Sequence, residues 1–319
     1  MTSMTASARD PAAFVLRLIA WGTVLATFAF LLENWLVYWQ GFPGAWTGLA
    51  SGSYVAVSVY LVGLAIAIYA ATRPLDGGFR QDSARVSAIA AWIARAAFWI
   101  ALLVGTADAV VSFLRIEGSL PGLVGQQVAD QLNLPQYRGQ VVHMPLAALG
   151  LLMAFVTRGL SFIWLSLLVV VVQLIIVIGR FVFSYEQAFI TDLVRMWYAA
   201  LFLFASAYTL LEEGHVRVDI FYAAMSRRGK ALVNGIGAVV LGMSLMWVIL
   251  VLGTATRASP IVGPFIGYEQ GQQAFGMATK YWLSAFLAIF AALMLVQFSA
   301  MLLKAVADWR GEPETGKAV

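Results

Sequence analysis

The chain has 319 residues, of which 61% are hydrophobic and only 11% are charged. Soluble domains carry about 25% charged residues, so this chain has too little polar surface to face water, and we expect an all-α polytopic membrane protein. The absence of cysteine excludes disulfides, thiol nucleophiles and cysteine-ligated metals. The net charge of +4 is typical of the cytoplasmic loops of a membrane protein and does not indicate a nucleic-acid partner.

Apolar stretches predict the membrane spans in chain order. The first three lie at residues 12–37, 49–72 and 88–114. The polar segments at residues 73–85 and 115–140 contain several Gly and Pro residues, and we expect both to be loops. Further apolar stretches follow at residues 141–157, 162–183, 192–211, 231–255 and 281–305.

The segment at residues 141–157 decides the number of spans. It is close to the minimum of about 17 residues that crosses a bilayer, and it contains His143 and Pro145. If it crosses, the chain has eight spans, and most Lys and Arg residues of the loops fall on the side of the N-terminus; with seven spans this bias is lost. We therefore expect about eight transmembrane helices with both termini in the cytoplasm, and seven is the alternative.

Ionisable residues inside spans are candidates for function because a charge in lipid costs several kcal/mol. In the topology with eight spans, Glu33, Asp108 and Arg180 all lie toward the outer side, which allows a cluster of carboxylates and a guanidinium. The alternative is that each side chain lies near a helix end and reaches the membrane interface.

The sequence gives no good case for an enzyme. Its two histidines, His143 and His215, could hold at most one haem. It has no zinc-protease spacing, no serine nucleophile elbow and no phosphate-binding glycine loop. We therefore expect no catalytic residue, no cofactor and no metal site.

The densest charged segment, residues 212–234, connects two predicted spans. Gly214 can end the preceding helix, and Asp219 and Ser226 can cap the short helices that follow. Apolar side chains of this elbow would lie on the membrane surface, with Arg228 and its basic neighbours at the level of the lipid headgroups. Composition alone thus indicates a cytoplasmic elbow in contact with membrane lipids.

The residue order of this elbow is more specific. Two groups of residues stand out: Gly214, His215, Val216, Arg217, Val218 and Asp219, and then Phe221, Tyr222, Ser226 and Arg228. Together they resemble the signature of the small (Q-type, DctQ-like) membrane subunit of tripartite ATP-independent periplasmic (TRAP) transporters. Residues 179–185 also resemble the end of that family's first span, and Asp192 stands where the family usually has an acidic residue.

The resemblance implies a division of the chain. Residues 162–306 would form the four-helix small permease domain, and residues 307–319 a polar C-terminal tail. Residues 1–161 lie outside the resemblance, carry three or four further spans, and correspond to the extension that enlarged family members have.

The resemblance also implies a function. The protein would be a non-catalytic scaffold subunit in the bacterial inner membrane, within a sodium-coupled transporter that imports organic acids (carboxylates). Its partners would be the large, elevator-type (M-type) membrane subunit and the periplasmic substrate-binding protein. His215, Arg217 and Asp219 would then fix the elbow by local bonds.

The alternative function is a self-sufficient small transporter or channel. Glu33, Asp108 and Arg180 would line its path. This alternative predicts flux of a solute through the chain alone in liposomes.

Overall fold

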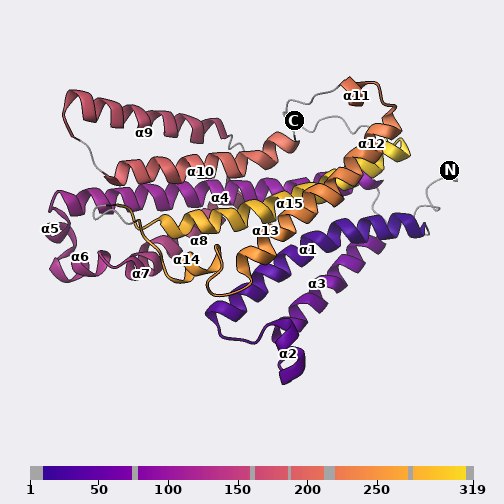
Figure 1. Ribbon diagram of the computed structural model, residues 1–319, viewed down its shortest axis with the longest axis horizontal. Coiled ribbons are helices and arrows are strands. Elements are labelled where there is room, and N and C mark those ends of the chain that lie inside the picture. The colour runs from indigo at the N-terminus through magenta and orange to yellow at the C-terminus, as the bar shows by residue number, and fades with distance from the viewer. Residues whose placement is uncertain are drawn as a thin grey trace. The chain divides into compact units, whose positions relative to one another are not determined.

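The computed structural model describes residues 10–73, 78–158, 162–185, 188–211, 220–271 and 276–313 (Figure 1). Over these residues every regular element is helical, and none is a strand. In chain order the elements are α1 (Pro11–Trp39), α2 (Ala45–Ser51), α3 (Val55–Thr72), α4 (Gly78–Ile116), α5 (Leu120–Val124), α6 (Gln126–Leu132), α7 (Pro135–Arg138), the π-helix η2 (Gly139–His143), α8 (Met144–Val156), α9 (Phe162–Val182), α10 (Ala188–Leu211), α11 (Ile220–Ala223), α12 (Arg227–Ile236), the π-helix η3 (Gly237–Met243), α13 (Ser244–Thr254), α14 (Val262–Ile266) and α15 (Lys280–Arg310).

Within the described residues, seven helical runs are long and apolar enough to cross a membrane, which confirms an all-α membrane protein. They are Pro11–Trp39, Val55–Thr72, Gly78–Ile116, Pro135–Val156, Phe189–Ala207, Arg227–Thr254 and Lys280–Arg310. The segment with His143 therefore belongs to a run of 22 residues that is long enough to span. Helix α9 contributes a shorter apolar segment, Ser166–Val182, and its role as an eighth span stays a prediction.

The second span begins later than its hydropathy suggests. Residues 49–51 belong to the separate helix α2, which ends at Gly52 with a φ of +78°, a conformation that glycine adopts without strain. Helix α3 starts three residues further on, at Val55. The predicted start at residue 49 is therefore wrong, because a left-handed glycine cap separates the two apolar segments.

The predicted loop at residues 73–85 is also wrong in its second half. Helix α4 already begins at Gly78, because the carboxylate of Glu312 accepts hydrogen bonds from the backbone N–H groups of Phe79 (3.1 Å) and Arg80 (2.9 Å). The first N–H groups of a helix have no partner inside the helix. A cap from the far end of the chain supplies that partner here, and local sequence patterns do not reveal it.

The predicted loop at residues 115–140 folds into the three short helices α5, α6 and α7. Leu120, Ala129 and Leu132 are buried there and pack against Leu114 and Tyr137. This small apolar cluster gives the segment a core of its own, so its Gly and Pro residues separate helices instead of producing irregular chain.

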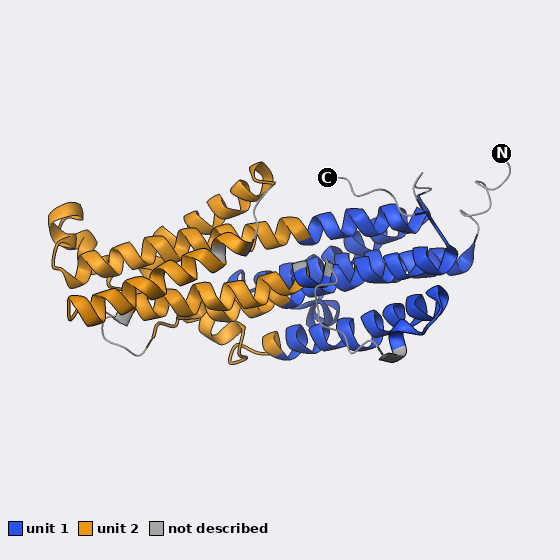
Figure 2. Cartoon of the chain, turned by 90° about the horizontal axis from the view of Figure 1, so that it is seen from above, with its two compact units in different colours: residues 1–90, 209–252, 291–319 blue, residues 91–208, 253–290 orange. Residues whose placement is uncertain are grey.

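The chain divides into two compact units, which Figure 2 shows in two colours. Unit 1 contains residues 1–90, 209–252 and 291–319, and unit 2 contains residues 91–208 and 253–290. Each unit thus combines residues from before and after position 162, where the sequence predicts a boundary between an extension and a permease domain. That predicted boundary stays a prediction.

Close helix packing holds each unit together. In unit 1, α1 lies along α3, with Gly63 beside Leu25. In unit 2, Gly150 of α8 packs against the backbone of Ile100 on α4. A residue as small as Gly150 allows helices in lipid to approach this closely.

Candidate functional site

The most buried charged group of unit 2 is the carboxylate of Asp108, on α4. Its Oδ1 accepts a hydrogen bond from Arg138 Nη1 at 3.0 Å and lies 3.0 Å from His143 Nε2. Its Oδ2 accepts one from the backbone N–H of Ala278 at 2.8 Å. Burial of a lone charge is strongly unfavourable, and pairing with hydrogen-bond donors offsets that cost. Both oxygens of Asp108 are engaged in this way.

Arg138 provides the counter-charge from the end of α7, and its side chain is 1% exposed. Its Nε donates to the carbonyl oxygen of Leu132 (2.8 Å), and Nη1 also lies 3.4 Å from Ser112 Oγ. Pro135 opens α7, a position that suits proline because the missing N–H is not needed there. The short helix thus aims a guanidinium at the buried carboxylate.

His143 connects this ion pair to the aromatic residues of α15. Its Nδ1 lies 2.6 Å from the hydroxyl of Tyr281 and 3.4 Å from Trp282 Nε1, while Nε2 faces Asp108. A neutral imidazole that donates from Nε2 to Asp108 and accepts at Nδ1 from the Tyr281 hydroxyl satisfies its two closest partners. Asp108, Arg138, His143 and Tyr281 together are called the Asp108 network below.

A second carboxylate, Asp192 on α10, holds the adjoining backbone. Its Oδ2 accepts from the N–H of Met277 at 3.0 Å, directly before the N–H that Asp108 binds. Arg115 donates to the carbonyl oxygen of Gly276 at 3.1 Å. The chain that leads into α15 is therefore fixed by side chains of α4 and α10.

A cavity of about 460 Å³ lies beside this fixed segment in unit 2. It is lined by Asp192, Arg195, Met196, Gly271, Met277, Thr279, Lys280 and Leu283. Lys280 pairs with Glu269 (2.9 Å), which lies outside the lining, and Arg195 lies 3.5 Å from Asp192, so each charged group of the wall has an opposite charge nearby.

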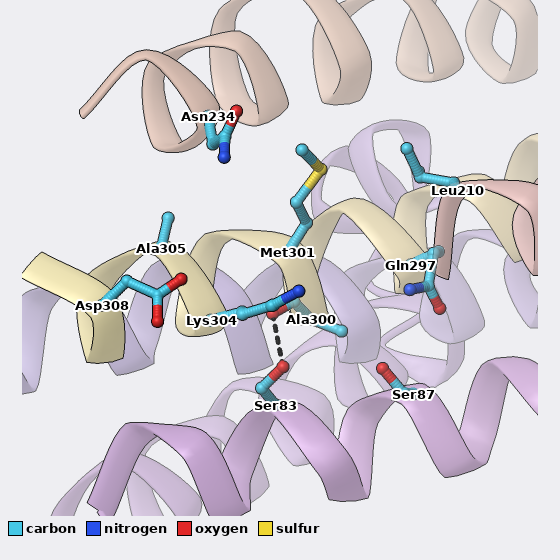
Figure 3. A pocket seen from close by; sticks show the side chains of 10 residues that line it. All are labelled: Ser83, Ser87, Leu210, Asn234, Gln297, Ala300, Met301, Lys304, Ala305 and Asp308. Carbon is cyan, nitrogen blue, oxygen red and sulfur yellow. Dashed lines mark hydrogen bonds between the residues drawn. The ribbon is translucent and has the colours of Figure 1, made fainter. Parts of the chain in front are cut away.

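Unit 1 contains a smaller polar cavity of about 50 Å³ (Figure 3). Ser83 and Ser87 point toward it from α4, and Ser83 Oγ donates to the carbonyl oxygen of Ala300 at 2.8 Å. The amide side chains of Asn234 on α12 and Gln297 on α15 also line the cavity. A water needs about 10–15 Å³ of such space and several polar partners, so this cavity suits a small group of waters.

The three intramembrane residues predicted from sequence have separate partners. Glu33, in unit 1, accepts from the N–H of Ala45 (2.7 Å) and from the hydroxyl of Tyr60. Asp108 lies in the network described above, and the exposed Arg180 lies 5.9 Å from the ring of Phe181. Since Glu33 belongs to one unit and Asp108 and Arg180 to the other, their assembly into one cluster stays a prediction.

Most of the predicted elbow signature lies outside the described residues, namely Gly214, His215, Arg217 and Asp219. The described part begins at α11. Ser226 caps α12, since its Oγ accepts from the N–H of Gly229 at 3.2 Å. The guanidinium of Arg228 lies 6.0 Å from the ring centroid of Trp309.

Sequence reasoning did not identify Arg138 as a site residue, and it considered His143 only as a haem ligand. Arg138 lies in the segment expected to be a loop, and His143 in the segment of ambiguous depth. The available signal was Asp108 itself, because a carboxylate deep in a span requires a cation or donor nearby. The sequence does not say which one.

The C-terminal part of the chain matches a known protein family. Residues 167–308 match the family model described as "Tripartite ATP-independent periplasmic transporters, DctQ component". No curated protein and no solved structure matches the chain. The matched range includes Asp192 and Tyr281, whereas Asp108, Arg138 and His143 precede it. Residues 167–308, called the DctQ region below, are therefore similar to the DctQ component, the small membrane subunit of TRAP transporters.

Proposed function

We propose that this protein is the scaffold subunit of a sodium-coupled TRAP transporter that imports organic acids across the bacterial inner membrane. It would support the large elevator-type subunit and help to dock the periplasmic substrate-binding protein. Substrate class, sodium coupling and these partners are those expected of the family that residues 167–308 match.

The main support for a scaffold role comes from the buried charges of unit 2, which bind one another and the backbone. Asp108 and Asp192 bind the consecutive N–H groups of Ala278 and Met277, and Arg138 and His143 bind Asp108. Polar groups that engage one another in this way rigidify a structure. The Asp108 network thereby connects the extension to the DctQ region, which favours one fixed body against which a partner can move.

The first experiment is to purify the tagged full chain from its own host in mild detergent and to measure the native mass of what is obtained. We expect a stoichiometric complex with a second, larger polytopic membrane protein. Recovery of the chain alone or as a homo-oligomer would contradict the proposal. Flux of a solute through the chain alone in liposomes would instead support a self-sufficient transporter or channel.

The elbow provides a second test. Arg217→Ala and Asp219→Ala should lower recovery of the complex and the rate of organic-acid uptake, without a change in substrate preference. Arg73→Ala, which removes an exposed charge at the end of α3, serves as the control. A variant that changed which organic acid is imported would count against a scaffold role.

A further inference from the structure

A groove in unit 1 has an apolar floor along helices that are long enough to cross a membrane. Its volume is about 530 Å³, within the range of about 300–1,000 Å³ that is typical of small-molecule sites. Its lining from α12 and η3 includes Leu232, Ile236 and Val240, at intervals of four residues, and each of them is half exposed. Leu302 and Val306 of α15 form another wall, and α1 contributes Ala12 and Leu16.

One end of the groove is aromatic and basic. Trp309 and Arg310 line it there, at the end of α15, and the guanidinium of Arg228 lies 6.0 Å from the Trp309 ring centroid. Arg310 pairs with Asp10 at 2.6 Å. Across the described residues no carboxylate pairs with Arg228, which leaves its positive charge for an anion.

The apolar wall of the groove and its basic end lie one after the other along the same helices. The apolar side chains of η3 lie inside the predicted span, and the basic residues of α12 lie at its start, where a helix leaves the hydrocarbon. Trp and Arg side chains favour that depth, and basic pockets between membrane helices bind anionic headgroups. A ligand that fits both the apolar wall and the basic end has a hydrocarbon chain next to a negatively charged phosphate.

We propose that the groove between α1, α12–η3 and α15 binds one anionic phospholipid. An acyl chain lies along Leu232, Ile236 and Val240, and the phosphate lies at Arg228, next to Trp309. Because α1 belongs to the extension and α12–η3 and α15 to the DctQ region, the lipid would join these two parts of unit 1.

The test is native mass spectrometry of the full chain in detergent, titrated with phosphatidylglycerol or with phosphatidylcholine of identical acyl chains. We expect phosphatidylglycerol to bind more tightly. Arg228→Gln should weaken the binding of phosphatidylglycerol about fivefold, which is the effect of one basic residue near a membrane surface. The same variant should leave the binding of phosphatidylcholine unchanged. Arg73→Gln, at the exposed end of α3, should weaken neither lipid.

Filling the groove tests the acyl-chain site separately. Ile236→Trp should lower binding of both lipids, and Val240→Trp is the second variant if the first does not fold. Leu241→Trp changes a neighbouring residue that is more exposed and does not line the groove, so it should have no effect. Size-exclusion chromatography and thermal unfolding establish that each variant is folded.

Three results would overturn the proposal. The first is equal binding of the two lipids by the unchanged chain. The second is competition by glycerol phosphate, which has no acyl chains, at the same concentration as the lipid, since that would mean a phosphate site alone. The third is a loss of dimer or of a co-purified protein in Ile236→Trp with unchanged lipid binding, since a protein would then occupy the groove.

Discussion

Asp108 is buried, and its two oxygens bind Arg138, His143 and the N–H of Ala278. Asp108→Asn should destabilise the protein by about 3–5 kcal/mol, because loss of one partner of a buried ion pair leaves the other charge uncompensated. Thermal unfolding of the purified chain in detergent measures this change.

Two variants serve as controls for this prediction. Asp130→Asn alters an exposed carboxylate that accepts a hydrogen bond from Gln126 (2.8 Å), and it should leave the melting temperature unchanged. The double variant Asp108→Leu/Arg138→Met removes both charges and should be more stable than Asp108→Asn alone. Equal melting temperatures for Asp108→Asn and the unchanged chain would mean that the ion pair has no role in stability.

Tyr281→Phe tests the aromatic end of the same network. The hydroxyl lies 2.6 Å from His143 Nδ1, and its removal deletes one buried hydrogen bond between uncharged groups. We expect a loss of about 1 kcal/mol, clearly less than for Asp108→Asn. A loss as large as that of Asp108→Asn would indicate that the hydroxyl supports the whole ion pair and not one hydrogen bond alone.

At this scale the sequence identified Asp108 as exceptional but not its partners. A carboxylate in the middle of an apolar stretch is recognisable without a structure, because its burial needs compensation. Arg138 and His143 lie 30 and 35 residues further along the chain. Only the folding of α5–α7 brings them back to α4, and no local pattern encodes that return.

Helix packing depends on which glycines touch backbone. A Cβ on Gly150 would lie 2.9 Å from the backbone nitrogen of Ile100, so α8 would have to move away from α4. A Cβ on Gly63 would meet Leu25 O and Ala29 Cβ at 3.7 and 3.9 Å, which are ordinary contacts. Gly150→Ala should therefore cost about 1–3 kcal/mol, and Gly63→Ala should cost nothing.

Thermal unfolding of both glycine variants, together with the native protein, provides the measurement. Both substitutions favour the helical conformation equally, since alanine is the better helix former. Any difference between them therefore reports the packing of α8 on α4. If the two variants unfold at the same temperature, the close approach at Gly150 does not hold the helices together.

A separate prediction concerns the start of α4, which is capped by Glu312. Glu312→Ala removes the acceptor for the N–H groups of Phe79 and Arg80, and loss of a cap costs about 1 kcal/mol. Hydrogen exchange should then become faster at residues 79–81 and stay unchanged at the middle of the helix. Faster exchange along all of α4 would show that the carboxylate does more than cap its first turn.

Sequence patterns predicted most of the membrane helices because lipid imposes length and apolarity on them. They failed where the ends depend on something other than hydropathy. Gly52 divides one apolar segment in two, and Glu312 extends α4 into a segment rich in Gly and polar residues. The short helices of residues 120–138 form because a few apolar side chains pack together, a signal too weak to distinguish from a loop.

Residues from the two sides of position 162 pack together within each unit. Ser83 donates to the carbonyl of Ala300 in unit 1, and Trp197 Nε1 donates to the carbonyl of Ala101 (3.0 Å) in unit 2. We therefore expect residues 162–319, expressed alone, to aggregate in detergent. Supplying residues 1–161 as a second chain should restore a monodisperse complex in size-exclusion chromatography. A monodisperse, helical 162–319 fragment would show that the DctQ region is independent of its extension.

The elbow motif allowed the family to be recognised from sequence, although most of its residues lie outside the described part of the chain. A motif reports common descent without any knowledge of contacts. The division of the chain is different, because it depends on which helices pack together. Each compact unit takes residues from both sides of position 162, and the spacing of apolar segments contains no information about such interleaving.

The burial of α15 has a consequence for how the protein is made. This helix follows all the other described helices in chain order, it contributes residues to both units, and more of it is buried than of any other candidate span among the described residues. A nascent chain released before residue 280 would lack the partner of Ser83, the hydroxyl that meets His143, and the cap of α4. Incomplete translation products of this protein should therefore be recognised and degraded by membrane quality control, and they should not accumulate as partly folded subunits.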